Sequence, residues 1–146
     1  MRIVKIPKSV YKKFTNNEFK TFFQEFYGKT TSKGYWTTFS TRERKLLFAA
    51  KEDNKIIGTI SLRLGHKVAG IGAFVVATGK RNKGIGSMLL VKCEQTAKKY
   101  KCVKIWLHAL PATPAYAFYK NHGYSEEARL KKHFGGKDLC IMSKFI

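Results

Sequence analysis

Acidic residues are scarce in this chain of 146 residues, which has 9 Asp and Glu against 29 Lys and Arg. The formal net charge of +20 predicts attraction to an anionic partner such as nucleic acid, an acidic protein surface or a phosphorylated ligand. The cations are scattered along the chain, with modest clusters at 98–104 and 131–132. Scattered lysines are also typical of a plain solvated surface, so the charge alone leaves a polyanion partner open.

Long apolar runs are missing as well. No stretch approaches the ~18–20 apolar residues that a membrane-spanning helix needs. The N-terminal segment MRIVKIPKSVYKKF has neither an uninterrupted apolar core nor a small-residue cleavage site, so we expect no signal peptide. The three cysteines are odd in number and too widely spaced for a zinc site or a disulfide framework: Cys93, Cys102 and Cys140. We therefore expect reduced thiols in a cytoplasmic protein, with no metal and no membrane contact.

The length and the 44% content of hydrophobic residues fit one domain over residues 1–146 with a real core. In the first part of the chain, residues 2–6 are a candidate strand. A capping box at Thr15–Glu18 precedes aromatic residues at helical spacing, which predicts a helix ending at Gly28. Residues 29–45 are polar and predict a loop or a short helix.

Three strands are expected next, at 45–51, 56–64 and 68–76. The turn signals between them fall at 52–55 and 64–67. Because such short turns join neighbouring strands, the three should form an antiparallel meander.

The pattern then changes to alternating helices and strands. A helix is expected from Gly84 onward, followed by a strand at 102–108, a short helix at 115–121, and a strand pair at 124–129 and 139–145. A helix between two strands predicts a right-handed βαβ unit, in which 68–76 and 102–108 lie parallel. The fold class expected is α/β with a mixed sheet.

The segment KRNKGIG, residues 80–86, lies at the joint between the strand at 68–76 and the next helix. A helix N-terminus carries unsatisfied N–H groups and partial positive charge, so it favours phosphate. Glycines let a phosphate approach the backbone, and Arg81 and Lys83 add charge. The segment lacks the Gly-Lys-Ser/Thr of a Walker loop and the GxGxxG of a dinucleotide fold. Taken alone, it is equally compatible with a basic surface turn.

The wider context favours a phosphate site. Arg81-x-x-Gly84-x-Gly86 resembles the acyl-CoA loop of the GNAT superfamily of N-acetyltransferases, Arg/Gln-x-x-Gly-x-Gly/Ala. AYAFYKNHGY, residues 115–124, resembles the family's Ala-x-x-x-Tyr-x-x-x-Gly-Phe/Tyr helix, with Tyr119 at the tyrosine position. The order of elements is also similar to the family's. The resemblance implies a GNAT-like mixed sheet that splays between its two parallel strands and is flanked by helices.

The resemblance also implies acetyl-CoA as co-substrate and direct transfer of its acetyl group to an amine in a ternary complex. The pantetheine arm would pair with the backbone of Phe74, Val75 and Val76, and a backbone N–H near Val76 would polarise the thioester carbonyl. The diphosphate would lie on the amides of Arg81, Asn82, Lys83, Gly84, Ile85, Gly86 and Ser87. An asparagine that often begins the second motif is replaced here by Ala112, which removes one cofactor contact.

Tyr119 occupies the position of the family's general acid. A tyrosine, with a reference pKa of about 10, can hold a proton at neutral pH and give it to a thiolate, with a reference of about 8.5. The alternative is that Tyr119 packs against the cofactor sulfur or hydrogen-bonds to it.

The general base is not evident, because no Asp or Glu lies between Asp53 and Glu94 or between Glu94 and Glu126. His108 is the main candidate, since imidazole exchanges protons near neutral pH. The spacing to Tyr119 places Leu107, and not His108, where some relatives carry a glutamate. His66, a water chain or an amine that arrives unprotonated remain open.

The resemblance implies that the amine acceptor lies against the N-terminal segment and the last strand pair, here the aromatic segment 19–39 and the basic turn 131–137. An aromatic rim flanked by cations suits an amine on an acidic carrier, such as a protein N-terminus, a lysine in an acidic context or an aminoacyl-tRNA; a small polyamine fits less well. Two other readings remain: an inactive GNAT-like module that binds nucleic acid through the +20 charge, and an unrelated small α/β binding domain. A homodimer also remains open.

Overall fold

The computed structural model describes residues 7, 9–10 and 44–146. The elements in chain order are β1 (Arg44–Glu52), β2 (Lys55–Gly65), β3 (Val68–Val76), the 3-10 helix η2 (Thr78–Lys80), α3 (Ile85–Lys99), β4 (Lys104–Ala109), α4 (Pro114–Asn121), β5 (Ser125–Phe134) and β6 (Lys137–Phe145). The strands form one six-stranded sheet in the order β1-β2-β3-β4-β6-β5. The mixed α/β fold predicted from the sequence is confirmed.

Strands β1, β2 and β3 form the expected antiparallel meander. Their turns are tight because pairs of residues adopt left-handed backbone, Asp53 with Asn54 and His66 with Lys67. Alternate residues of β2 point to one face, where Ile60, Leu62 and Leu64 are buried, as the two-residue period of a strand requires.

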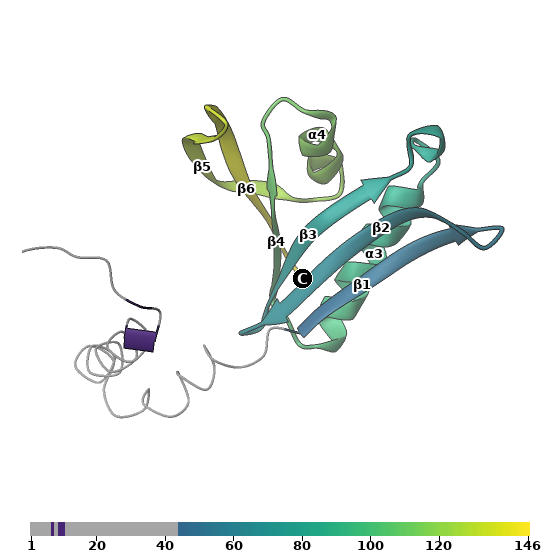
Figure 1. The fold of residues 1–146 in the computed structure, drawn as a ribbon, viewed down its shortest axis with the longest axis horizontal. Helices are drawn as coiled ribbons and strands as arrows, with labels where there is room; N and C mark the ends of the chain where they lie inside the picture. Colours follow the sequence, from purple (N-terminus) through teal and green to yellow (C-terminus); the bar gives the residue numbers. More distant parts are fainter. Residues whose placement is uncertain (1–6, 8, 11–43) are drawn as a thin grey trace, which may run out of the picture. The chain divides into compact units, whose positions relative to one another are not determined.

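Helix α3 covers this face of β1, β2 and β3 (Figure 1). The apolar spacing that predicted the helix is the spacing of its buried residues: Ile85, Leu89, Leu90, Cys93 and Ala97. Burial of this stripe against the strands stabilises the helix, because helices of this length are marginal when isolated.

The parallel pair of β3 and β4 is short. The two strands are paired at only three positions, from Val68 with Lys104 to Gly70 with Trp106. Beyond these positions β4 stays paired with β6 up to Ala109, and β3 stays paired with β2 up to Val76. Figure 1 shows β3 and β4 diverging toward their C-terminal ends. The splayed sheet that the resemblance implied is therefore present.

A β-bulge in β3 lies where the two strands separate. Ile71 is opposite Leu62 and Phe74 is opposite Ile60, so β3 carries one extra residue at this point. A Cβ at Gly72 would lie 2.5 Å from the Ser61 hydroxyl, so a larger residue there would force the buried Ser61 side chain to move. Because a bulge bends its strand, it helps to turn the end of β3 away from β4.

Boundaries shift from those expected, most of all in the last strand pair. Strand β5 runs on to Phe134, so the expectation of a basic turn over 131–137 is wrong: only Gly135 and Gly136 lie between β5 and β6. Strand β4 begins at Lys104 because the Cys102 amide still bonds to Ala97 O at the end of α3, and Lys101 has positive φ. Helix α4 begins at Pro114, capped by the Thr113 side chain. The strand at 2–6, the helix after Thr15 and almost all of segment 29–45 lie outside the described residues, and the single domain over 1–146 stays a prediction. None of the helices in the described ranges combines the length and apolar character needed to cross a bilayer.

Candidate functional site

A cleft of about 700 Å³ lies between the end of β3, the start of α3 and α4. Most of the residues predicted to hold the cofactor line it, together with the predicted acid: Phe74, Val75, Val76, Arg81, Asn82, Gly84, Gly86, Ser87 and Tyr119. Residues not predicted also line it: Lys80, Pro114, Ala115, Phe118 and His122. The structure thus brings together the two motifs that lie more than thirty residues apart in the sequence.

The N-terminus of α3 opens into this cleft without a side-chain cap. Gly84 occupies the N-cap position in left-handed backbone, with φ of 76°, and space beyond it is open. The Met88 amide makes the bond to Gly84 O at 3.0 Å that begins the helix. The amides of Ile85, Gly86 and Ser87 precede it and so lack intrahelical partners. Such a group of free N–H donors suits an anion.

The end of β3 presents free backbone to the same cleft. The Ala77 amide donates to Ile57 O on β2 at 2.9 Å. Because backbone polar groups alternate sides along a strand, the N–H and C=O of Val76 point away from β2 toward the opening. Arg81 Nε donates to Val76 O at 3.1 Å, which holds the guanidinium at the mouth of the cleft.

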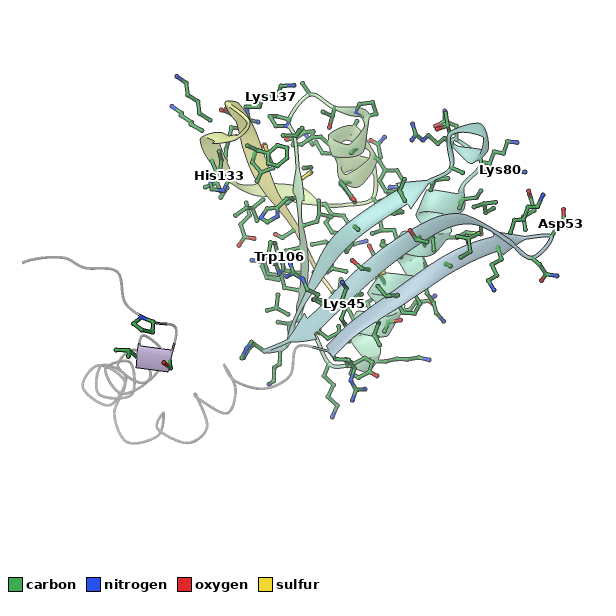
Figure 2. All side chains as sticks on the ribbon, in the orientation of Figure 1. Lys45, Asp53, Lys80, Trp106, His133 and Lys137 are labelled. Atoms are coloured by element: carbon green, nitrogen blue, oxygen red, sulfur yellow. The ribbon has the colours of Figure 1, made fainter. Side chains whose placement is uncertain are left out.

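The mouth of the cleft is positively charged. Lys80 forms an ion pair with Glu52 and is labelled in Figure 2 at this end of the sheet. The Lys80 hydrogen bond and charge lower the pKa of Glu52, with a smaller contribution from Lys83. One carboxylate thus faces the three cations Lys80, Arg81 and Lys83, so the loop keeps net positive charge for an anionic ligand.

Tyr119 lies at the floor of the cleft, 7% exposed, among aromatic rings. The Phe74, Phe118 and Tyr124 rings lie 6.3, 5.4 and 5.7 Å from its own, centroid to centroid. Burial raises the pKa of Tyr119 to about 12, with a smaller contribution from Cys93. No residue of 44–146 forms a hydrogen bond with its hydroxyl. The side chain is thus a neutral donor without a protein partner in this part of the chain.

His122 connects the two motifs, which the sequence did not reveal. Its Nδ1 lies 2.7 Å from Phe118 O, and its Nε2 lies 2.9 Å from Ser87 Oγ. A carbonyl only accepts, so Nδ1 carries the proton and, in the neutral ring, Nε2 accepts from the Ser87 hydroxyl. The bond ties α4 to the first turn of α3. His122 stands at an unspecified position of its motif and Ser87 lies 35 residues earlier, so no local signal pairs them.

Three predicted site residues do not line the cleft: Lys83, Ile85 and His108. The Ile85 side chain is in the core, so only its amide is available. His108 is exposed and contacts Trp106, with ring centroids 5.1 Å apart. Since Leu107 is buried in the core with Tyr119, His108 points to the opposite face of β4. Its role as base stays a prediction. His66 lies in the β2–β3 turn, at the other end of β3 from Val76.

A polar network fixes α4 against the last strands. The Tyr116 hydroxyl donates to Glu126 Oε2 at 2.9 Å, and Arg129 and the Cys140 thiol donate to the same carboxylate. These three donors, Arg129 first, lower the pKa of Glu126 to about 2. The network keeps α4, and with it Tyr119, in a fixed position.

The three cysteines are unsuited to act as nucleophiles. All three are buried and free. Burial raises the pKa of Cys93 to about 12 and also raises the pKa of Cys102 and Cys140. Their thiols therefore stay protonated at neutral pH, whereas a nucleophile needs the thiolate.

Three features are typical of the acetyltransferase family that the two motifs resemble. They are the splayed sheet, the helix that begins at a glycine, and the helix that carries the tyrosine. Residues 11–124 match the model of the acetyltransferase (GNAT) family. The chain belongs to this family, and the expectation of a GNAT fold is confirmed.

Solved structures agree on the fold. An acetyltransferase from Bacillus cereus aligns with 100% of this chain and 99% of its own, at 20% identity and a TM-score of 0.73. The ribosomal-protein-S18-alanine N-acetyltransferase from Escherichia coli aligns over 79% and 76%, at 21% identity and a TM-score of 0.66. Arabidopsis thaliana Naa50, in complex with the bisubstrate analogue CoA-Ac-MVNAL, aligns over 67% and 71%, at 25% identity and a TM-score of 0.62. No curated protein matches the chain significantly.

Proposed function

We propose that this protein is an N-acetyltransferase that moves the acetyl group of acetyl-CoA to a primary amine. The observation that carries the proposal is one cleft lined by the uncapped N-terminus of α3, by the end of β3 that is not paired with β4, and by Tyr119. Each part of acetyl-CoA has a suitable contact in this cleft. The helix N-terminus suits the diphosphate, the end of β3 suits the pantetheine arm, and Tyr119 suits the leaving thiol.

The cradle for the diphosphate is the loop from Arg81 to Ser87. Its free amides and the positive end of the helix favour the anion, and left-handed Gly84 leaves open space for it. Arg81 and Lys83 add charge. The backbone groups of Phe74 and Val76 are available to an extended arm because β4 is not paired with β3 there. Those of Val75, which lies opposite Thr59, point to β2, so the contact predicted at Val75 is limited to its side chain.

In the proposed reaction the amine nitrogen attacks the thioester carbonyl carbon, a C–N bond forms, and the C–S bond breaks. The Val76 N–H faces the opening and is placed to stabilise charge on the carbonyl oxygen. Tyr119 donates a hydrogen bond to the departing sulfur. Its pKa near 12 makes full loss of the proton costly, so we assign stabilisation of the thiolate to this hydrogen bond, with protonation completed as product leaves.

The amine must lose a proton before or during attack. We keep His108 as the candidate base. It is exposed and lies near the C-terminal end of β4, where this strand diverges from β3. Because its side chain points away from Tyr119, it would act through water. Water alone, or an amine that arrives unprotonated, is the competing route. The reaction needs no cysteine nucleophile.

Among acceptors, a peptide or protein amine is the one to test first. The analogue CoA-Ac-MVNAL in the Naa50 complex joins CoA to a peptide, and this fold is similar over 67% of the chain. The alternative from the sequence, an inactive nucleic-acid module, is less favoured, because a buried tyrosine that lines a cleft of about 700 Å³ has no evident use in such a module.

The experiment is calorimetric titration of nuclease-treated full-length protein with acetyl-CoA. We expect one-to-one binding that weakens more than about 100-fold in Gly84→Glu, because like charges in contact cost several kcal/mol. Gly136→Glu is the matched control: Gly136 has φ of 75°, also faces open space, and lies in the β5–β6 turn.

Equal loss in both glycine variants would show that backbone strain, and not the phosphate cradle, causes the effect. Absence of binding in the wild type would remove the proposal.

A further inference from the structure

A second positively charged surface lies at the opposite end of α3 from the cleft. It consists of seven exposed cations from the start of β1, the β2–β3 hairpin and the C-terminus of α3, and we call it the basic end: Arg44, Lys45, Arg63, Lys67, Lys98, Lys99 and Lys101. Lys45 and Lys80 are labelled toward opposite ends of β1–β3 in Figure 2. With 15 residues at 1.5 Å each, α3 separates the basic end from Gly84 by about 22 Å.

Contacts between the three segments place these cations at one end of the sheet formed by residues 44–146. Arg44 donates to the Tyr100 hydroxyl at 2.7 Å, which joins β1 to the end of α3. The Val103 amide donates to Lys67 O at 2.8 Å, which joins the segment after α3 to the hairpin. Lys45 and Arg63 are directly opposite in the β1–β2 register.

No described carboxylate forms an ion pair with any of these seven cations. Four of the six acidic residues of 44–146 form ion pairs with other cations, Lys80, Lys104, Arg129 and Lys144. Glu127, the partner of Lys104, borders the basic end, since Lys104 is opposite Val68. Asp53 lies in the β1–β2 turn at the far end of β1, and Asp138 accepts from the Lys132 amide. Residues 1–43 contain three acidic residues, Glu18, Glu25 and Glu43, against nine Lys and Arg. The chain as a whole cannot balance the charge.

Fold stability does not require this concentration of charge. The dipole of α3 favours Lys98 and Lys99 at its C-terminus. It gives no reason for Lys45 and Arg63, because like charges directly opposite on paired strands are destabilising. A surface that keeps such a pair despite the repulsion is suited to an anionic partner that relieves it.

We propose that the basic end is a docking surface for the phosphate backbone of a single nucleic-acid strand. Several phosphates in a row match cations drawn from three segments better than one small anion does. Exposed aromatic rings lie among or beside the cations: Tyr100 is 45% exposed, and Phe145, paired with Lys104 at the start of β4, is 76% exposed. Aromatic rings beside cations suit the stacking of unpaired bases. The surface is separate from the acetyl-CoA cleft and does not depend on the proposed reaction.

The test is fluorescence anisotropy of a labelled 20-nucleotide oligouridine with full-length protein between 50 and 200 mM salt. We compare Lys98→Gln/Lys99→Gln with Lys51→Gln/Lys55→Gln, which removes the same charge from exposed residues at the other end of β1. We expect roughly tenfold weaker binding in the first pair and less than twofold in the second, with the salt slope of the first reduced by about 1.4. Both should bind acetyl-CoA like the wild type, which reports that they are folded.

Equal weakening in both variants would overturn the proposal, because net charge alone would then explain binding. Loss of the oligouridine on saturation with acetyl-CoA would place it in the cleft instead. Tighter binding to anionic phosphatidylserine vesicles than to oligouridine, sensitive to the same two lysines, would assign the surface to a membrane. Absence of oligouridine binding at 50 mM salt would also refute it.

Discussion

The two ends of α3 both carry cations, yet they differ in the pairing of the strands beside them and in the presence of a cleft. At the N-terminal end the strands diverge, the helix begins at left-handed Gly84, and a cleft of about 700 Å³ opens between α3 and α4. At the C-terminal end β3 and β4 are paired, from Val68 with Lys104 to Gly70 with Trp106. Cations at the first end lie around backbone N–H groups that have no intrahelical partner, whereas those at the second end lie beside paired strands.

The difference shows that positive charge alone does not distinguish the proposed acetyl-CoA site from the basic end. A basic patch attracts anions through long-range electrostatic forces, which salt weakens. A helix N-terminus in a cleft adds oriented N–H groups, which recognise one phosphate group in one position. We therefore expect variants at the cleft to change affinity and turnover for acetyl-CoA, and variants at the basic end to leave both unchanged.

Tyr119→Phe should have the largest effect on turnover among the cleft variants that still bind acetyl-CoA. Loss of the hydrogen bond to the departing sulfur should lower kcat about 100-fold or more while KM for acetyl-CoA changes little. The hydroxyl has no partner among residues 44–146, so its removal leaves no group there unsatisfied. Steady-state kinetics with a peptide amine measure the effect.

Tyr124→Phe is the matched control, since it removes a neighbouring buried hydroxyl that bonds to Glu94 instead of facing the cleft. It should change kcat less than twofold. A pH profile adds a second check: because burial raises the pKa of Tyr119 to about 12, the active protonated form persists below that pH. Suppose that kcat of the wild type falls with rising pH already below pH 10, and that this fall is absent in Tyr119→Phe. That result would contradict a protonated Tyr119.

His108→Gln should have the next largest effect, at most about 100-fold on kcat, because a base that acts through water is partly replaced by solvent. The acidic limb of the pH–rate profile should flatten in this variant. His66→Gln, at the other end of β3, should leave the limb in place. If both profiles match the wild type, the amine is deprotonated by water or arrives unprotonated.

Arg81→Lys should weaken acetyl-CoA binding about tenfold although the charge is kept, since charged hydrogen bonds contribute about 1.5–3 kcal/mol. The variant loses the paired N–H donors of the guanidinium and also the hydrogen bond from Nε to Val76 O. Lys83→Gln, which removes a charge without a structural contact of this kind, should weaken binding less. The opposite order, measured by calorimetry, would mean that the mouth of the cleft acts by charge alone, like the basic end.

His122→Gln should have the smallest effect, about a threefold rise in KM for acetyl-CoA, from loss of one neutral hydrogen bond between α4 and Ser87. The value of kcat should stay unchanged, because His122 positions the loop and does not touch the reacting atoms. A fall in kcat with unchanged KM would assign it to the chemistry instead.

The fold could be predicted largely from local patterns. Turn residues and helical spacing predicted the six strands and the two helices α3 and α4, but not the 3-10 helix η2. The two motifs pointed to Arg81, Gly84 and Tyr119, which line the cleft. What could not be predicted depends on contacts distant in sequence. The pairing of β4 with β6 along its whole length, but with β3 only at its start, joins residues more than thirty positions apart, and so does the bond from His122 to Ser87. Gly72 was a missed local signal, because a glycine inside a strand often indicates a bulge.

The most direct measurement of the central claim is residue-resolved amide hydrogen exchange of the full-length protein with and without acetyl-CoA. Binding at the cleft predicts slower exchange at Phe74, at Val76 and at residues 82–87, which border the opening, and no change at 98–103. No protection at the cleft, or protection confined to 98–103, would contradict the account, because the positive charge would then bind acetyl-CoA without the helix N-terminus.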